Sequence, residues 1–253
     1  MSARRTLATT RRILNQLRHD KRTIGLIILV PCLVLGLIAW MFHGETVSGP
    51  LGLPVPVIDF FGPMLLAILP AVMMFLVTSV ATLRERTGGT LERLMTTPTT
   101  KADFLFGYAL AFAVAATIQA VAATAWAVWV CGMQVRGQVW EVVVVAVVDA
   151  VLGSTMGLAA SALSRTEFQA VQMLPAVIFP QLVVCGIVMP RNQMPQILEW
   201  LSNVMPFTYA IEATQTIAKG RGLEHAVGSL SVVVLFIVLC LVAGVLSLRR
   251  RTG

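Results

Sequence analysis

Long apolar runs dominate the chain and alternate with short polar segments. Six of these runs are about 20 residues long or longer, which is the length that an α-helix needs to cross the roughly 30 Å hydrocarbon core of a bilayer. They cover residues 24–42, 60–83, 104–130, 142–163, 168–189 and 226–248. Because lipid offers the backbone no hydrogen bonds, such runs predict six membrane-spanning helices.

The composition agrees with this interpretation. Of the 253 residues, 57% are hydrophobic and only 12% are charged, whereas a soluble domain carries about 25% charged residues. So little polar surface cannot cover a soluble fold, and the excess apolar surface must face lipid. The sequence therefore predicts an all-α membrane protein, with residues 1–253 forming a single transmembrane domain.

The basic residues are concentrated on one side of this arrangement. Fifteen of the nineteen Lys and Arg residues precede the first run or follow the second, fourth and sixth runs, and only four lie in the other connections. Because loops rich in Lys and Arg stay in the cytoplasm, both termini are predicted to be cytoplasmic. The net charge of +7 is spread over the ends of the runs, which argues against the single basic patch of a nucleic-acid-binding protein.

Residues 3–20 predict an amphipathic helix. Leu7, Leu14 and Leu17 fall on one helical face, while arginines occupy the rest. Such a helix lies flat at the membrane surface, with its apolar face toward the acyl chains and its cations among the headgroups of membrane lipid. The alternative is a positively charged leader that only sets the topology.

Two connections on the other side differ from each other. Residues 43–57 are rich in Gly and Pro and predict an irregular connector. Residues 190–212 contain an apolar stretch too short to span, with Pro195 and Pro206 around it. We expect a short extracellular re-entrant helix pair there, because a seventh span would move the C-terminus to the side with few cations.

The connection over residues 84–103 predicts a short helix beneath the membrane. Gly88 and Gly89 interrupt the helix that leaves the bilayer, and Thr90 is placed to cap a new one. The new helix has an apolar stripe formed by Leu91, Leu94 and Met95. An apolar face outside the membrane needs a protein partner or the lipid surface; the alternative is an ordinary solvated connector.

Two motifs in this order resemble the permease subunits of ABC type-2 exporters, including the daunorubicin-resistance-like permeases of bacteria. The first motif is matched by Glu85, Gly89, Thr90, Leu91, Glu92, Leu94, Thr97 and Pro98. The second, between the last two spans, is matched by Pro190, Pro195, Pro206 and Tyr209. Together with the six-span pattern, the resemblance extends over nearly the whole chain.

The resemblance implies a type-2 exporter permease fold, with an interfacial N-terminal helix, six spans and a short re-entrant pair before the last span. It implies that 84–103 is a coupling loop that binds a separate ABC ATPase subunit, present in two copies. A second permease, identical or paralogous, would complete the path for a hydrophobic or amphipathic substrate, either a drug or lipid-like. The implied location is the bacterial cytoplasmic (inner) membrane.

The chain lacks the motif needed to bind ATP itself. A phosphate-binding loop requires a Lys that follows a Gly and precedes Ser or Thr. Lys21, Lys101 and Lys219 are the only lysines, and none has these neighbours. We therefore expect no cofactor and no catalytic residue on this chain, with ATP and Mg²⁺ bound by the partner ATPase.

Polar residues inside the spans are candidates for a substrate path. Asp149 is the one ionisable residue well inside a span, where a charge is costly. It would either meet the substrate or a proton, or bond to a neighbouring helix. Gln119 and Gln172 are candidates for the same path or for interhelical hydrogen bonds. Small residues four apart, Gly153 and Gly157, predict close helix packing.

Acidic residues near the outer ends of the spans are expected to be solvated: Glu141, Glu199, Glu212 and Glu224. The four cysteines show no CxxC pair, so no metal site is predicted, and they are interpreted as small buried hydrophobes. A disulfide between Cys131 and Cys185 is left open.

Two other functions compete with the exporter. A membrane-embedded enzyme would need a nucleophile, base or metal cluster at membrane depth, but His19, His43 and His225 all lie outside the predicted spans. An ion-coupled secondary carrier or channel would use Asp149, although such carriers often have several intramembrane charges.

Overall fold

The computed structural model describes residues 3–48, 53–88, 101–187, 189 and 191–247. Its elements are α1 (Ala3–His19), α2 (Lys21–Met41), β1 (Thr46–Ser48), β2 (Pro54–Pro56), α3 (Val57–Thr87), α5 (Lys101–Ala125), the π-helix η1 (Trp126–Val130), α6 (Val139–Leu163), α7 (Glu167–Val184), the 3-10 helix η2 (Arg191–Gln193), α8 (Gln196–Val204), α9 (Pro206–Ala218) and α10 (Leu223–Ser247). In the described part, six helices are long and apolar enough to cross a membrane, namely α2, α3, α5 with η1, α6, α7 and α10. The prediction of an all-α fold with six spans is confirmed.

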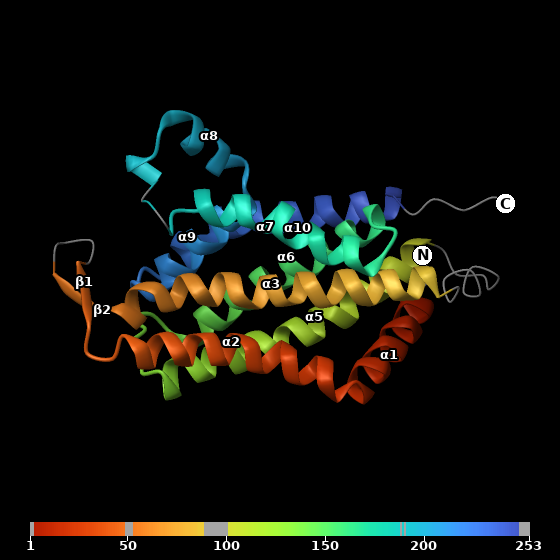
Figure 1. The fold of residues 1–253 in the computed structure, drawn as a ribbon, viewed down its shortest axis with the longest axis horizontal. Coiled ribbons are helices and arrows are strands. Elements are labelled where there is room, and N and C mark those ends of the chain that lie inside the picture. Colours follow the sequence, from red (N-terminus) through yellow and green to blue (C-terminus); the bar gives the residue numbers. More distant parts are fainter. Residues whose placement is uncertain (1–2, 49–52, 89–100, 188, 190, 248–253) are drawn as a thin grey trace.

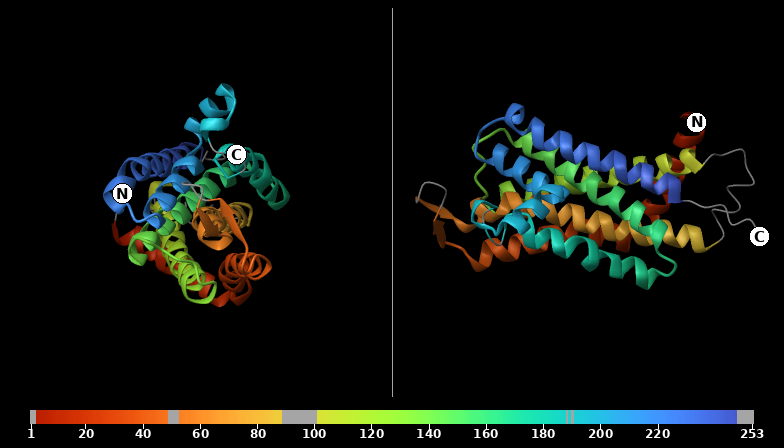
Figure 2. Two further views of the ribbon diagram at one scale, coloured as in Figure 1. Left: turned by 90° about the vertical axis from the view of Figure 1, so that its left-hand side faces the viewer. Right: turned by 90° about the horizontal axis from the view of Figure 1, so that it is seen from above.

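The six long helices run side by side (Figure 1), and α3 lies at the centre of the bundle when it is viewed end-on (Figure 2). α3 packs against α2, α5, α6, α7 and α9, while α10 packs against α6 and α9. The end of the bundle that carries α1, the end of α3 and the end of α10 is here named the α1 end. The opposite end carries the strands and α8 and is named the hairpin end (Figure 1).

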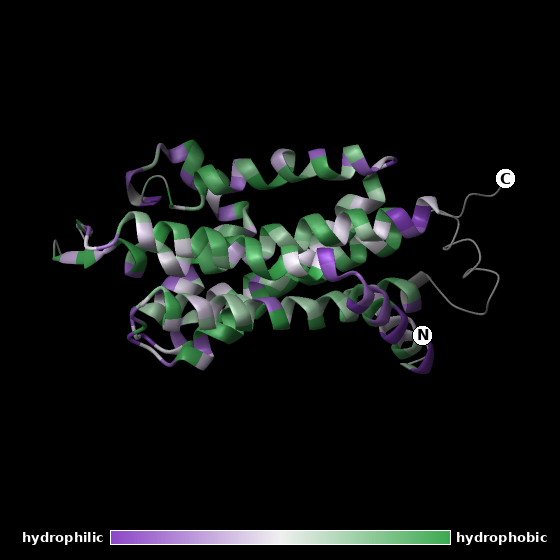
Figure 3. Cartoon of the chain, turned by 60° about the horizontal axis from the view of Figure 1, so that its bottom comes forward, coloured by the Kyte–Doolittle hydropathy of each residue, from purple (hydrophilic) through white to green (hydrophobic). Residues whose placement is uncertain are grey.

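Hydrophobic residues predominate along the spans, and hydrophilic residues predominate in α1 (Figure 3). The exposed leucines Leu26, Leu29, Leu33 and Leu37 line one side of α2. An exposed stripe of this kind would be costly in water. It is expected of a helix that faces hydrocarbon.

α1 packs against α5 through part of its apolar face. Ile13 is buried in this contact, whereas Leu7 is 58% exposed. Close approach depends on Gly107 of α5, where a Cβ atom would lie 2.6 Å from Cβ of Thr9. The Thr10 hydroxyl donates to the Gly107 carbonyl at 3.2 Å. α5 therefore covers one part of the α1 face and leaves Leu7 open; the position of α1 at the membrane surface stays a prediction.

α3 and α6 pack closely against each other in the bundle core. A Cβ atom at Gly153 would lie 2.0 Å from the Ala71 carbonyl oxygen, and one at Gly157 would lie 2.5 Å from the carbonyl oxygen of Phe75. No side chain fits at either distance. The predicted close packing at these two glycines is confirmed.

Two expectations for the hairpin end were wrong. Residues 43–57 are not irregular, because β1 and β2 pair antiparallel within them, with Val47 opposite Val55. Glu141 is not solvated but 8% exposed, and its Oε1 accepts a hydrogen bond from the Leu223 backbone N–H at 3.3 Å. A carboxylate at the first turn of α10 satisfies an otherwise unpaired N–H and the positive end of the helix dipole.

The helix ends also refine the predicted spans. α3 continues to Thr87, beyond the predicted limit at 83, and ends at Gly88. α7 ends at Val184 rather than 189, because Gly186 adopts a φ of +97°, which a helix cannot accommodate. All four cysteines are free, which excludes the disulfide left open between Cys131 and Cys185.

Candidate functional site at the α1 end

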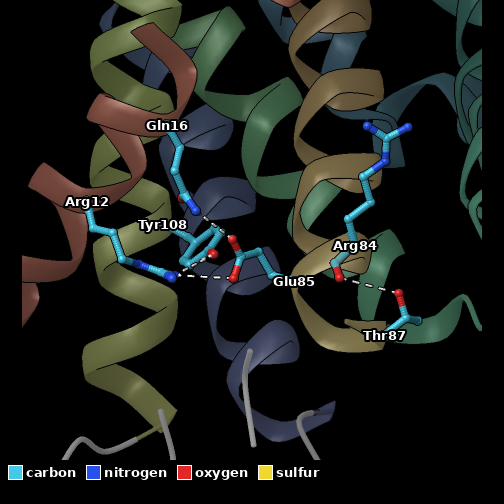
Figure 4. Close-up of polar contacts among 6 residues, drawn as sticks. All are labelled: Arg12, Gln16, Arg84, Glu85, Thr87 and Tyr108. Atoms are coloured by element: carbon cyan, nitrogen blue, oxygen red, sulfur yellow. Dashed lines mark hydrogen bonds and ion pairs between the residues drawn. The ribbon is translucent and has the colours of Figure 1, made fainter. Parts of the chain in front are cut away.

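Glu85, the first residue of the predicted coupling motif, lies in the last turn of α3 and faces α1 (Figure 4). Its Oε2 lies 3.4 Å from Arg12 Nη2, and its Oε1 accepts a hydrogen bond from Gln16 Nε2 at 3.1 Å. The Glu85 side chain is only 16% exposed. Because both carboxylate oxygens are bound by α1, Glu85 joins two helices that are far apart in the sequence.

Arg12 also binds α5. Its Nη2 donates to the Tyr108 hydroxyl at 3.1 Å (Figure 4). The Tyr108 ring is buried, with its centroid 4.4 Å from that of Phe104. The guanidinium group therefore connects α1, α3 and α5 at one point, and a half-buried charge of this kind is favourable only while its partners remain in place.

The two residues on either side of Glu85 bind other helices. Arg84 points away from Glu85 (Figure 4) and forms a bidentate contact with Glu167 at the start of α7, at 2.8 and 2.9 Å. Arg86 donates to the Ser161 carbonyl at the end of α6. Three consecutive residues therefore attach the last turn of α3 to α7, α1 and α6, so any displacement of this turn acts on all three helices.

A groove of about 500 Å³ is lined by α1, the start of α2, α3, α5 and one residue of α7, with Glu85 in its wall. One part is polar and contains Gln16, Asp20 and Arg84. Hydrogen bonds from the hydroxyl and backbone N–H of Thr23 lower the pKa of Asp20, so its carboxylate stays charged. The other part is apolar and is lined by Ile13, Leu17, Leu76, Val77, Val80, Ala81, Phe112 and Val171. The groove is therefore amphipathic.

The model of the family described as ABC-2 type transporter matches residues 5–218. The chain belongs to the ABC-2 type transporter family. The resemblance drawn from the two motifs is confirmed, and the chain is a multi-pass membrane protein.

Curated relatives agree with this assignment. The chain is 29% identical to ABC transporter G family member 20 of Dictyostelium discoideum over 169 aligned residues. The aligned residues are 66% of this chain and 23% of that protein. It is 29% identical over 152 residues to the probable multidrug ABC transporter permease YbhR of Escherichia coli (strain K12), and the aligned residues are 59% of this chain and 41% of that protein. It is 23% identical over 185 residues to the probable multidrug ABC transporter permease YbhS of the same strain, and the aligned residues are 73% of this chain and 47% of that protein. The chain thus spans between about a quarter and a half of the length of these relatives.

Most of the coupling motif of this ABC-2 family member lies outside the described residues: Gly89, Thr90, Leu91, Glu92, Leu94, Thr97 and Pro98. Glu85 is the one motif residue whose surroundings the structure gives. Its attachment to Arg12 and Gln16 could not be predicted, because the partners lie 73 and 69 positions away. The amphipathic pattern of residues 3–20 predicted a helix at the lipid surface and gave no sign of this contact with the end of α3.

The structure places the three candidate path residues in different surroundings. Asp149 is fully buried in α6, and its Oδ2 accepts a hydrogen bond from the Thr214 hydroxyl of α9 at 3.2 Å. Gln119 is buried in α5 and donates to the Ile27 carbonyl of α2 at 2.9 Å. Gln172 is exposed on α7. The structure therefore brings Asp149 and Gln119 into interhelical hydrogen bonds and leaves only Gln172 open.

The contact of Gln119 has a local cause in α2. Pro31 lies inside this helix, and the carbonyl four residues before a proline has no N–H partner in its own helix. That carbonyl belongs to Ile27, and it is the one that Gln119 binds. The amide thereby satisfies an acceptor that the proline leaves unpaired at membrane depth, where an unpaired backbone group is costly.

The second motif shapes the helix pair at the hairpin end. Pro195 precedes α8 and Pro206 begins α9, while Pro190 lies outside the described residues. The Tyr209 hydroxyl donates to the Asn203 carbonyl at 2.8 Å, and Arg191 donates to the Asn203 side chain. The first bond holds α8 against the start of α9, and the second attaches η2 to α8. Within the described residues, no group of three or more His, Cys, Asp or Glu residues could hold a metal ion.

Proposed function

We propose that this chain is the permease subunit of an ATP-driven ABC exporter. The α1 end is cytoplasmic, in a bacterial inner membrane, and a separate ATPase subunit, present in two copies with ATP and Mg²⁺, acts on the loop between α3 and α5. The observation that carries the proposal is the attachment of Arg84, Glu85 and Arg86 to three helices directly before that loop.

The attachment gives the loop a mechanical connection to the bundle. α3 contains 31 residues, or about 46 Å at 1.5 Å per residue, and it reaches from the loop to the hairpin end. A force on residues 89–98 would act first on the last turn of α3. From there it would pass to α1 through Glu85 and to α7 through Arg84. Movement of the loop and movement of the bundle would therefore be coupled.

The outward face of α7 supports a second permease, either identical or paralogous. α7 packs against α3, α6, α8 and α9 on one side only. Its other side exposes Phe168, Gln172, Ala176 and Phe179. An amide facing hydrocarbon is costly, and a small residue such as Ala176 permits close approach of another helix. Gln172 would therefore face a partner permease or the polar path between the two.

The amphipathic groove beside Glu85 supports an amphipathic substrate, either a drug or lipid-like. Its apolar wall suits a hydrocarbon part, and its polar residues Gln16 and Asp20 suit a headgroup. Two of the relatives are named as probable multidrug permeases, which agrees with a substrate of this class. Asp149 and Gln119 are buried in helix contacts and would support the path indirectly.

The hairpin end would be the extracellular side, with α8 and α9 as the re-entrant pair. All five tryptophans are exposed there, four of them near the ends of spans and one in α8: Trp40, Trp126, Trp129, Trp140 and Trp200. Tryptophan prefers the boundary between membrane and water. The Trp200 position in α8 therefore supports a helix at this boundary.

A second candidate function is an ion-coupled secondary carrier or channel. One observation favours it: Asp149 is fully buried, and its Oδ1 has no hydrogen-bond partner in the described part of the chain. A carboxyl of this kind could accept a proton. Its position between α6 and α9, outside the groove beside Glu85, favours the exporter instead.

The coupling assignment is tested by Leu91→Asp and Glu92→Arg in the full chain, co-produced with its ATPase. Both variants are expected to insert in the membrane and to lose substrate-stimulated ATP turnover. Glu199→Arg is the matched control, because Glu199 is an exposed acid in α8 at the opposite end. Substrate-stimulated turnover at the unsubstituted rate in both loop variants would remove the assignment.

A further inference from the structure

A second groove lies at the elbow between α1 and α2, on the side facing away from Glu85. Its volume is about 280 Å³, and its walls include Leu14, Ile24, Ile28, Ala115 and Ile118 from α1, α2 and α5. Apart from Arg18, all the described residues that line it are apolar. It therefore combines a hydrocarbon-like interior with one cation.

Arg18 is available for a ligand. It is exposed in the last turn of α1 and has no hydrogen bond or ion pair with any residue that the structure describes. Arg11, Lys21 and Arg22 are exposed on the same two helices. Asp20 is the nearest acid along the chain, and Thr23 already binds its carboxylate. The elbow thus presents unpaired positive charge directly above an apolar groove.

The location determines which molecules can reach the groove. Ile24 and Ile28 belong to the first two turns of a membrane span, and Ile118, in another span, is 57% exposed. The apolar part of the groove therefore opens toward the hydrocarbon of the bilayer, and its cation lies at the level of the headgroups. A ligand must have an acyl chain and an anionic headgroup to satisfy both parts.

We propose that this groove binds one anionic phospholipid, with the phosphate at Arg18 and an acyl chain along Ile24, Ile28 and Ile118. The bound lipid would fill the gap between α1, α2 and α5 at the elbow. The site requires only that the chain spans a membrane, so it goes beyond the exporter function and can be tested without transport.

The test measures lipid retained by the full-length chain in detergent, by native mass spectrometry with added dioleoyl phosphatidylglycerol or dioleoyl phosphatidylcholine. Arg18→Gln is expected to weaken phosphatidylglycerol binding about fivefold, the effect of losing one basic residue at a membrane surface. It is expected to weaken phosphatidylcholine binding less, because the choline cation offsets the charge of the phosphate. Arg11→Gln is the matched control, because Arg11 is exposed on α1 but does not line the groove.

A second, independent variant tests the groove itself. Ile118→Trp fills it from an exposed position and is expected to reduce the binding of both lipids. Val121→Trp is its control, because Val121 is 45% exposed on the same helix and lies outside the groove. Equal phosphatidylglycerol retention by Arg18→Gln and Arg11→Gln, or equal retention of both lipids by Ile118→Trp and Val121→Trp, would overturn the proposal.

Discussion

Arg12 of the N-terminal helix and Glu85 at the end of α3 lie 3.4 Å apart, although 73 positions separate them in the sequence. The pair is partly shielded from water, because the Arg12 and Glu85 side chains are 32% and 16% exposed. Tyr108 and Gln16 complete the contact. Through this pair, the first residue of the predicted coupling motif is attached to α1.

The pair predicts that a charge swap restores what a single reversal removes. Glu85→Arg places two cations together and is expected to lower the free energy of unfolding by about 1.5–3 kcal/mol, the range for hydrogen bonds to charged groups. The double variant Arg12→Glu/Glu85→Arg is expected to regain part of this loss. Thermal unfolding in detergent measures both, and additive effects of the two single substitutions would contradict a direct contact.

The hydrogen bond from Gln119 predicts a dependence on Pro31. Gln119→Leu is expected to cost about 0.6–1.7 kcal/mol of stability, as found for hydrogen bonds between membrane helices. In a Pro31→Ala background the same substitution is expected to cost almost nothing, because the new N–H at position 31 can bind the Ile27 carbonyl. Gln172→Leu, on the exposed face of α7, is the control. An equal cost of Gln119→Leu in both backgrounds would show that the proline is not the reason for the bond.

The spans were predictable because each depends on a local property, the length of an apolar run. The same holds for the amphipathic pattern of residues 3–20 and for the end of α3 at Gly88. The contacts of Glu85 were not predictable, since its partners lie on another helix far along the chain. Glu141 shows the limit most plainly. Its place near the end of an apolar run indicated a solvated acid, but the later helix α10 brings the Leu223 N–H to it.

The contact between α3 and α6 predicts that an added methyl group at Gly153 destabilises the fold, whereas one at Gly228 of α10, outside this contact, does not. Gly153→Ala would place a methyl group 2.0 Å from the Ala71 carbonyl oxygen and is expected to cost about 1–3 kcal/mol or more, as overpacking does. Gly228→Ala in α10 meets nothing within 4 Å and is expected to be neutral or stabilising by up to about 1 kcal/mol. The melting temperatures of the two variants in detergent provide the measurement. A Gly153→Ala protein as stable as Gly228→Ala would show that the two helices do not touch here.

Asp149 separates the two candidate functions. Asp149→Asn keeps an acceptor for the Thr214 hydroxyl, 3.2 Å away, and an exporter powered by a partner ATPase is expected to retain ATP-dependent transport. An ion-coupled carrier would lose gradient-driven transport, because the amide of asparagine does not bind a proton near neutral pH. Transport lost in Asp149→Asn, with the melting temperature unchanged, would favour the carrier.

Reconstitution tests the central claim most directly. The chain is placed in proteoliposomes with and without its ATPase, and transport of an amphipathic fluorescent drug is measured with and without ATP and Mg²⁺. The account predicts transport only when the chain, the ATPase, ATP and Mg²⁺ are all present. Transport at the full rate by the chain alone would contradict it.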